Sequence, residues 1–305
     1  MSTQTTDPMQ PGPGPFPAGT AADTPGGPPH TPHPARALRR AAAYEWHHLR
    51  GLRATWVLLS VAAVLTVGNG VSLLLVADTD SAPTPATVAD ALQWAPAATQ
   101  LPLLALLLIA LGTSSVSTDL TRGAARTTWL TAASRTTAFV AKLCVAALLT
   151  SATAVVTVLI AGAAGASALA MSGTPQPAWE QTLPALLRFT LVMACWPVLA
   201  GSVAALLRNR VWTVLLLVLW PLIIERLTGL LLGRLLGISA LHEVLPFAAA
   251  RAAMADASDT STDASPAQGL LDNGLGPWTG LMVHVLFALA VAVAGAWAYR
   301  RRDGA

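Results

Sequence analysis

Six long apolar runs separated by shorter polar stretches dominate the chain from residue 54 onward. They span residues 54–76, 97–116, 143–165, 189–207, 211–230 and 278–299. All but the fifth match the ~20 residues that an α-helix needs to cross the hydrocarbon core of a bilayer. The fifth run reaches that length only if Glu225 and Arg226 lie at its outer margin. The pattern predicts an all-α polytopic membrane protein with six transmembrane helices.

Two different segments precede the first apolar run. Residues 1–35 are rich in proline and glycine and lack apolar periodicity, which predicts a disordered tail. Residues 36–53 place Trp46, leucines and alanines on one side of a helix and most basic residues on the other. This pattern is typical of a basic helix that lies in the membrane interface. Glu45 falls on its apolar side, where it either pairs with a local arginine or contacts another part of the protein.

The distribution of Lys and Arg predicts the orientation, because positive residues gather on the cytoplasmic side of a membrane protein. If the N-terminus is cytoplasmic, the inner segments hold fourteen Lys and Arg residues and the outer segments hold four. We therefore expect both termini in the cytoplasm. Only 11% of the residues are charged, against about a quarter in a soluble domain. The excess of arginine over lysine is typical of a high-GC bacterial genome.

The sequence lacks the common motifs of ATP binding and catalysis. The single lysine, Lys142, follows Phe-Val-Ala instead of the glycine loop that a P-loop requires. His242 and Glu243 begin a zinc-protease motif, but Pro246 stands where its second histidine belongs. No Gly-x-Ser-x-Gly motif surrounds a serine. Basic residues lie at the ends of apolar runs, which does not fit nucleic-acid binding. We expect neither an enzyme nor a metal site.

The connection between the second and third runs is short and basic. On the residues alone, Asp119 is an expected N-cap of a short helix whose arginines, Arg122, Arg126 and Arg135, face the cytosol. One interpretation is a loop that only fixes orientation. The other is a rigid helix that passes force from a cytosolic partner into the bundle.

This connection resembles the inner loop of type-2 permeases of ATP-binding-cassette (ABC) exporters. In that family an acidic residue, a glycine, an Arg-containing helix and a lysine at the start of the third span recur. Glu45 in the N-terminal helix, the stretches LWPLIIERL and VLPFAAARAAM, and the basic C-terminal AWAYRRRDGA also agree with the family. The resemblance covers about residues 36–303. The chain departs from the family pattern at Asp119, Ala124, Ala133 and Arg226.

The resemblance implies a permease domain over residues 36–303 that pairs with a second permease copy, identical or not. It also implies separate cytosolic ABC ATPase subunits, which bind ATP, so that this chain itself holds no cofactor. The implied activity is outward movement of a hydrophobic or amphipathic substrate across the cell inner (plasma) membrane. The residues that would form the ATPase-coupling loop are Asp119, Arg122, Gly123, Arg126, Arg135 and Lys142.

Two other functional interpretations fit the same pattern of apolar runs. The first is a polytopic membrane scaffold or assembly factor that transports nothing. The second is a membrane-embedded enzyme whose site follows no familiar motif. A cytosolic ATPase partner distinguishes the permease from both.

Two polar residues inside the apolar runs are open to two interpretations each. A carboxylate at the bilayer centre costs about 2.5–3.5 kcal/mol on insertion scales. Glu225 is therefore either an acid satisfied at the outer end, with Arg188 or Arg234 as its partner, or part of an outer gate. His284 is either a donor between helices or a ligand-binding residue, and the first is favoured. In the outer connection, residues 227–241 predict a short re-entrant or surface-lying helix.

Overall fold

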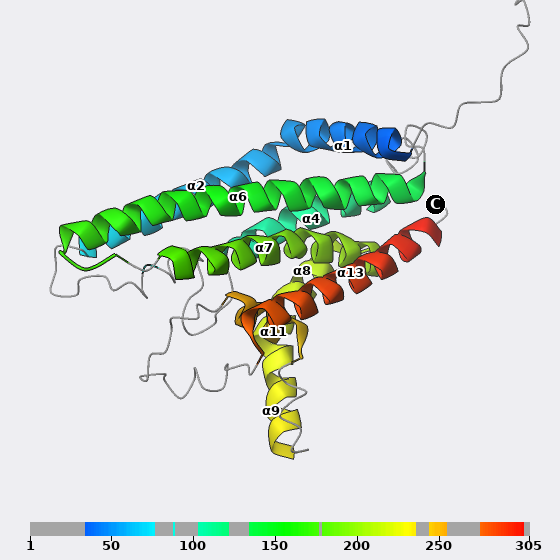
Figure 1. The fold of residues 1–305 in the computed structure, drawn as a ribbon. Helices are drawn as coiled ribbons and strands as arrows, with labels where there is room; N and C mark the ends of the chain where they lie inside the picture. The colour runs from blue at the N-terminus through cyan, green and yellow to red at the C-terminus, as the bar shows by residue number, and fades with distance from the viewer. Residues whose placement is uncertain are drawn as a thin grey trace, which may run out of the picture.

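The computed structural model describes residues 34–76, 88, 103–121, 134–176, 179–235, 244–254 and 275–301. Every regular element in these ranges is a helix, and no strand occurs in them. The elements are α1 (Pro34–Gly51), α2 (Arg53–Val76), α4 (Leu103–Thr121), α6 (Arg135–Met171), α7 (Trp179–Leu207), α8 (Arg210–Leu219), the π-helix η1 (Trp220–Ile224), α9 (Glu225–Leu235), α11 (Pro246–Met254) and α13 (Pro277–Arg301) (Figure 1).

Five helical stretches are long and apolar enough to cross a membrane. They are Arg53–Leu75, Arg135–Met171, Leu183–Leu207, Arg210–Gly229 and Pro277–Arg301. The apolar part of α4, Leu104–Ser114, is shorter, and residues 97–102 of the predicted second run lie outside the described residues. The all-helical fold is confirmed, and the five helices are compatible with a multi-pass membrane protein. The sixth crossing stays a prediction.

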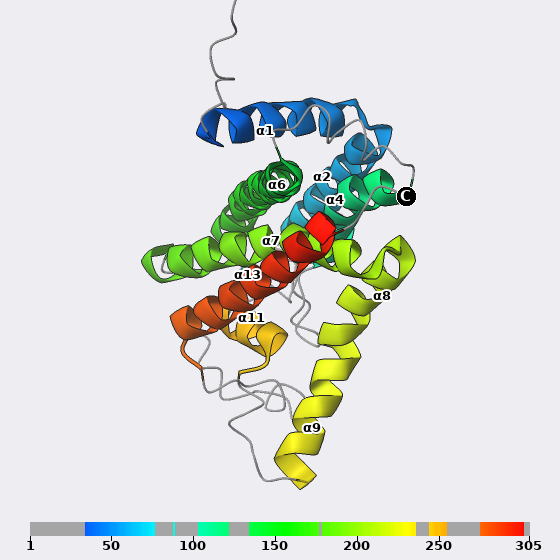
Figure 2. The ribbon, with the colours of Figure 1, turned by 90° about the vertical axis from the view of Figure 1, so that its right-hand side faces the viewer.

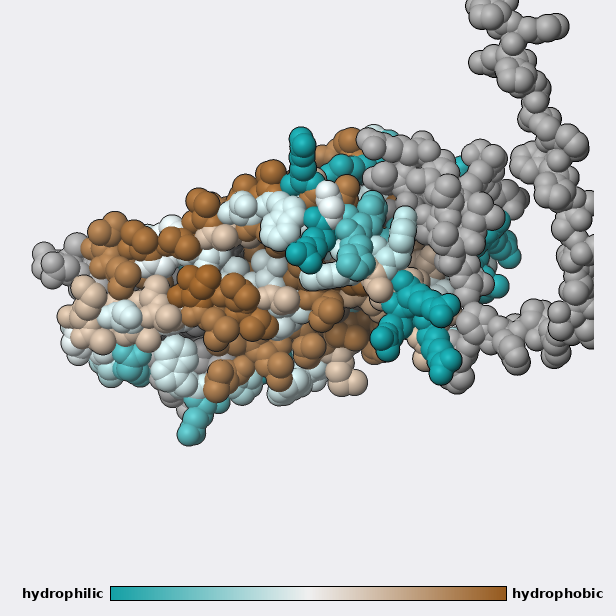
Figure 3. All heavy atoms as spheres, turned by 90° about the horizontal axis from the view of Figure 1, so that it is seen from above, coloured by the Kyte–Doolittle hydropathy of each residue, from teal (hydrophilic) through white to brown (hydrophobic). Residues whose placement is uncertain are grey.

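The outward faces of the long helices are apolar. Large exposed side chains on these faces include Val64 and Leu75 of α2, Leu148 and Leu159 of α6, and Val293 of α13. Figure 3 shows hydrophobic side chains (brown) along much of the molecule and hydrophilic side chains (teal) gathered mainly toward one end. Such faces suit contact with lipid, where apolar side chains need no polar partner.

The central helix of the bundle is α7, which packs against α4, α6, α11 and α13. It is the most buried of the five candidate spans. Gly112 of α4 lies so close to α7 that an added Cβ would stand 2.6 Å from the carbonyl oxygen of Pro197. A glycine at this crossing lets the two backbones approach, as small residues do between membrane helices.

We expect Gly112→Ala to destabilise the folded protein by about 1–3 kcal/mol, because the methyl group overpacks the crossing between α4 and α7. Gly68→Ala is the matched control, since a Cβ at Gly68 of α2 meets nothing within 4 Å. That control should be neutral or stabilise by up to about 1 kcal/mol, from better helix propensity. Thermal unfolding of the purified protein in detergent measures both, and equal midpoints would contradict the tight crossing.

Several helices extend beyond the predicted runs. The third predicted run, residues 143–165, lies inside α6, which begins at Arg135 after the N-cap Ser134. The hydroxyl of Ser134 accepts a hydrogen bond from the backbone N–H of Thr137 at 3.0 Å. Polar residues next to an apolar run continue a helix where no proline or cap interrupts it, so hydropathy alone places the boundary too far inside.

A sharp corner joins α7 to α8. Arg208 has a left-handed φ of 58°, which ends α7 because a non-glycine residue rarely continues a helix from that conformation. The side chain of Asn209 then caps α8 by accepting hydrogen bonds from the N–H groups of Val211 and Trp212. The corner separates the fourth and fifth predicted runs at the expected place.

The fifth run forms one helical rod made of α8, η1 and α9. Pro221 lies in η1 and cannot donate a backbone hydrogen bond, which the wider π-helical turn accommodates. The rod continues to Leu235, and Figures 1 and 2 show α9 (yellow) projecting away from the bundle. The helix predicted for residues 227–241 is present to Leu235, where it continues the fifth run, and residues 236–241 lie outside the described residues. Its re-entrant or surface-lying placement stays a prediction. Gly229 and Gly233 are tolerated within this continuous helix.

Candidate functional site

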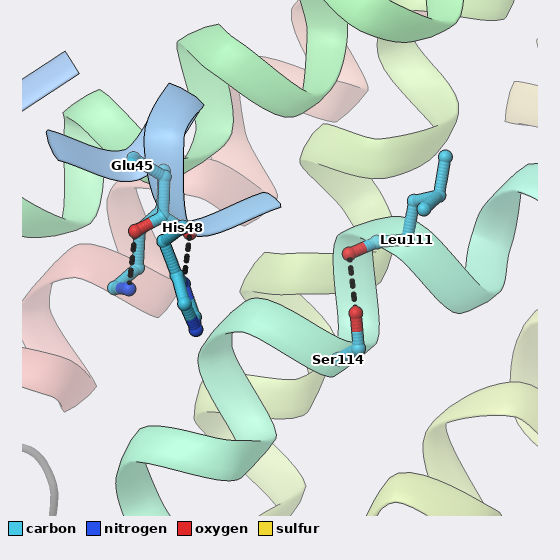
Figure 4. Close-up of polar contacts among 5 residues, drawn as sticks. Glu45, His48, Leu111 and Ser114 are labelled. Carbon is cyan, nitrogen blue, oxygen red and sulfur yellow. Dashed lines mark hydrogen bonds and ion pairs between the residues drawn. The ribbon is translucent and has the colours of Figure 1, made fainter. Parts of the chain in front are cut away.

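The first polar centre is a buried ion pair between α1 and α6. Lys142 Nζ donates a hydrogen bond to Glu45 Oε2 at 2.8 Å, and each side chain is only 2% exposed. His48 lies one turn further along α1, with Nδ1 3.6 Å from Glu45 Oε1 (Figure 4). Of the two interpretations of Glu45, contact with another part of the protein is confirmed.

This pair fixes the position of α1 on the bundle. Figures 1 and 2 show α1 (blue) lying across the N-terminal half of α6 (green), and Leu49, one turn after Glu45 on α1, is only 1% exposed. Breaking one partner of a buried ion pair leaves an uncompensated charge and costs about 3–5 kcal/mol. The contact is therefore specific, because neither partner can be lost alone without a large cost.

The remaining residues of the predicted coupling loop are only partly described. Arg135 begins α6, and its Nη1 donates to the carbonyl oxygen of Arg300 in α13 at 3.3 Å. Asp119 lies inside the last turn of α4, so its prediction as the N-cap of a separate short helix was wrong. The helix continues through Asp119 because no glycine or proline lies between Gly112 and Gly123. Arg122, Gly123 and Arg126 lie outside the described residues.

The second polar centre surrounds the short helix α11. Its residues from Phe247 to Met254 are all buried. At its N-terminus, Glu225 Oε1 accepts hydrogen bonds from the N–H groups of Phe247 at 2.9 Å and Ala248 at 2.7 Å. At its other end, Arg188 Nε donates to the carbonyl oxygen of Ala253 at 2.7 Å. A carboxylate at the start and a cation at the end both match the helix dipole.

The partner of Glu225 therefore differs from those expected. Glu225 is 1% exposed and belongs to α9, and its hydrogen-bond partners come from a helix start instead of an arginine side chain. Arg188 binds the opposite end of α11 and lies over the ring of Trp278, 5.4 Å from its centroid. The side chain of Arg234 is outside the described part of the chain. Backbone N–H groups thus satisfy one of the two carboxylate oxygens of Glu225.

Aromatic residues hold the first turn of α11 against α7 and α13. The ring of Phe247 lies 5.3 Å from that of Trp196, 5.8 Å from that of His284 and 6.2 Å from that of Phe287. His284 Nδ1 is 2.9 Å from the carbonyl oxygen of Pro246. The interhelical hydrogen bond favoured for His284 is thus confirmed, with a backbone acceptor.

The backbones of α11 and α13 also pack closely against each other. Gly280 of α13 faces α11 so closely that a Cβ would stand 2.5 Å from the carbonyl oxygen of Ala249. Arg251 of α11 is itself 6% exposed. Burial lowers the pKa of the Arg251 guanidinium from its ordinary value, the Glu225 carboxylate opposes that change, and the nearby Arg226 adds to it.

Sequence reasoning missed α11 as a buried helix. The stretch after Pro246 is nearly all alanine with one phenylalanine, one arginine and one methionine, so it has no polar face and no amphipathic period. Proline at the first helical position followed by good helix formers was the available signal. That signal does not predict that the helix is buried, because its burial depends on Glu225, Arg188 and His284 from three other segments.

The two polar centres lie in different parts of the bundle. Figure 1 shows α1 beside the N-terminal half of α6, whereas α11 lies beside the start of α13. Within the described ranges, no three His, Cys, Asp or Glu side chains gather as a metal site would require. Both cysteines, Cys144 and Cys195, are free. The chain matches no protein-family model and no curated protein.

Proposed function

We propose that the chain is the permease subunit of an ABC exporter in the cell inner (plasma) membrane. It moves a hydrophobic or amphipathic substrate outward, driven by ATP that separate cytosolic ATPase subunits bind. The resemblance of the basic connection to type-2 permeases supports this proposal. The observation that carries it furthest is the buried pair of Glu45 and Lys142, which joins α1 to α6 where that connection ends.

The pair explains how movement at the connection would reach the bundle. The coupling loop, residues 119–142, runs from the end of α4 into the first turns of α6. Because α6 packs against α1, α2, α4 and α7, a displacement of its N-terminus is passed to most of the described helices. The ion pair between Glu45 and Lys142 keeps the interfacial helix α1 attached to α6 when an ATPase pushes on the loop.

The proposal includes a topology and two kinds of partner. The chain crosses the membrane six times, with α4 and the residues before it as the second crossing and both termini in the cytoplasm. A second permease copy, identical or different, completes the transmembrane unit. In this frame α11 lies near the outer end, and Glu225, which holds its first turn, acts as the latch of an outer gate.

Charge reversal at Arg122 and Arg126 is expected to abolish co-purification of an ABC ATPase from native membranes. The expectation follows because two repulsive carboxylates would replace two cations at the proposed docking loop. A pull-down of the tagged full chain followed by mass spectrometry of its partners measures the effect. Arg208→Glu with Arg210→Glu is the matched control, since it makes the same charge change at another predicted inner segment.

The outcomes separate the permease from the scaffold. Loss of the ATPase from the coupling variant but not from the control supports the docking loop. If the wild-type chain brings down no ABC ATPase while other membrane partners are recovered, the permease proposal is wrong and a scaffold is favoured. An ATPase complex that survives the reversal unchanged would place the docking site elsewhere in the chain.

A further inference from the structure

The exposed face of α1 is strongly basic. All four arginines of this helix are exposed: Arg36, Arg39, Arg40 and Arg50. The one acid of α1, Glu45, is buried and paired with Lys142 of α6. At about 100° per residue, most of the arginines lie on the side of the helix opposite Glu45, so they face away from the bundle. Within the described residues no ion pair neutralises them.

The apolar side of α1 is taken up by the protein itself. Leu49, one turn after Glu45, is only 1% exposed, and the helix packs against α6 and α2. A free amphipathic helix lays its apolar side on the acyl chains of a membrane. In this chain that side is occupied, so α1 meets a membrane through its basic face and the edges of that face.

Aromatic side chains border the basic face. Tyr44 and Trp46 lie about 100° to either side of Glu45, and they are 54% and 42% exposed. Trp56 follows at the start of α2, where it is 55% exposed and its Nε1 donates a hydrogen bond to the carbonyl oxygen of Arg50 at 2.8 Å. Exposed Tyr and Trp are typical of the headgroup level of a bilayer, where one end of the ring is apolar and the other is wet.

The basic face continues into the apolar surface of α2. Beyond Trp56, the side chains of Val57, Val61 and Val64 are exposed. Cations, aromatic rings and aliphatic side chains thus follow one another along the chain, in the order of the phosphate, interfacial and hydrocarbon layers of one leaflet. Figure 3 views the molecule from the α1 side and shows hydrophilic side chains (teal) mainly toward one end. An acidic protein surface would match the arginines but not the rings and valines beside them.

We propose that the exposed face of α1 binds the anionic headgroups of membrane phospholipids, with the three aromatic side chains at the headgroup level. Arginine suits this role because its N–H groups match the oxygens of a phosphate. A negatively charged leaflet also attracts each cation held close to it. Because Glu45 and Lys142 join α1 to α6, the bound lipids hold both helices at the membrane surface. The inference does not rest on the proposed permease function.

The first test is native mass spectrometry of the purified full chain in a neutral detergent, titrated with phosphatidylglycerol or phosphatidylcholine. We expect tighter binding of phosphatidylglycerol, which alone of the two carries a net negative charge. Arg36→Gln with Arg40→Gln should lower the affinity for phosphatidylglycerol roughly tenfold or more, since each cation near an anionic surface contributes roughly fivefold. Binding of phosphatidylcholine should stay nearly unchanged. Arg208→Gln with Arg210→Gln, at two exposed arginines outside α1, is the matched control and should keep the preference.

A second measurement places α1 relative to a bilayer. A cysteine at the exposed Ala43 carries a bimane label, in a chain whose own two cysteines are replaced. The full chain is reconstituted in vesicles of equal parts phosphatidylglycerol and phosphatidylcholine. A nitroxide attached to the lipid headgroups should quench the label more strongly than the same nitroxide free in water.

The two measurements can each overturn the proposal. Equal affinity of the wild-type chain for the two lipids contradicts it, and so does a control that loses as much affinity as the α1 variant. Quenching by the soluble nitroxide alone also contradicts it, and places the basic face in water, where an acidic protein surface is its partner. Neither measurement involves an ATPase or the coupling loop, so failure here leaves the permease proposal to its own test.

Discussion

Replacing Lys142 with methionine is expected to destabilise the folded protein by about 3–5 kcal/mol, because it leaves Glu45 as a buried carboxylate without its cation. Methionine keeps the length and apolar stem of the side chain, so the loss reports the charge rather than a cavity. The two side chains are each 2% exposed and joined at 2.8 Å. Denaturant or thermal unfolding in detergent should show a large fall in midpoint.

Two further variants separate the ion pair from general damage. Replacing both partners, Glu45→Gln with Lys142→Met, should recover most of the stability, since a buried pair often contributes little net free energy against neutral residues. Arg39→Met removes a cation from an exposed position on α1 and should change stability by less than about 0.5 kcal/mol. A double variant as unstable as Lys142→Met would show that the lysine acts through other contacts.

The pair also illustrates what the hydrophobic pattern can and cannot predict. The helical period of residues 36–53 placed Glu45 on the apolar side of its helix and so marked it as a residue that needs a partner. The partner is 97 residues away in sequence, and the period of one helix does not say which face of another helix it meets. The same limit applies to Gly112 and Pro197, whose contact depends on a crossing of α4 and α7.

The predicted ends of helices were wrong where polar residues continue a helix beyond its apolar run. Asp119 was read as the start of a new helix because the apolar run ends near Val116, yet α4 continues to Thr121. The apolar run marks contact with lipid or core, whereas the helix ends where capping or a breaker ends it. The same difference explains why α6 starts at Arg135, eight residues before the run that predicted it.

The fold around α11 was the least predictable part. A helix buried on all sides lacks an amphipathic period, and its charged partners come from α7 and α9. The sequence singled out Glu225 because an acid inside an apolar run requires compensation. It gave no reason to expect that backbone N–H groups of a later segment supply it.

Replacing Glu225 with alanine is expected to loosen α11 by about 3 kcal/mol, the loss of two hydrogen bonds to a charged acceptor. The N–H groups of Phe247 and Ala248 lose their acceptor, and Arg251 loses its nearest attraction. Glu225→Gln should have a smaller effect, because the amide oxygen still accepts a hydrogen bond but carries no charge. The first turn of α11 should then open more often while the long helices stay packed.

The measurement is maleimide labelling of a cysteine placed at Ala250, which is 3% exposed, in a chain whose own two cysteines are replaced. A loss of 3 kcal/mol in local stability predicts a labelling rate roughly a hundredfold higher when opening is fast. Glu180→Ala, at an exposed acid of α7, is the control and should leave the rate unchanged. Labelling as slow in Glu225→Ala as in the parent would mean that α11 is held by its aromatic and glycine contacts alone. The carboxylate would then not be the latch of a gate, whereas a selective rise at position 250 ties the opening of α11 to this one side chain.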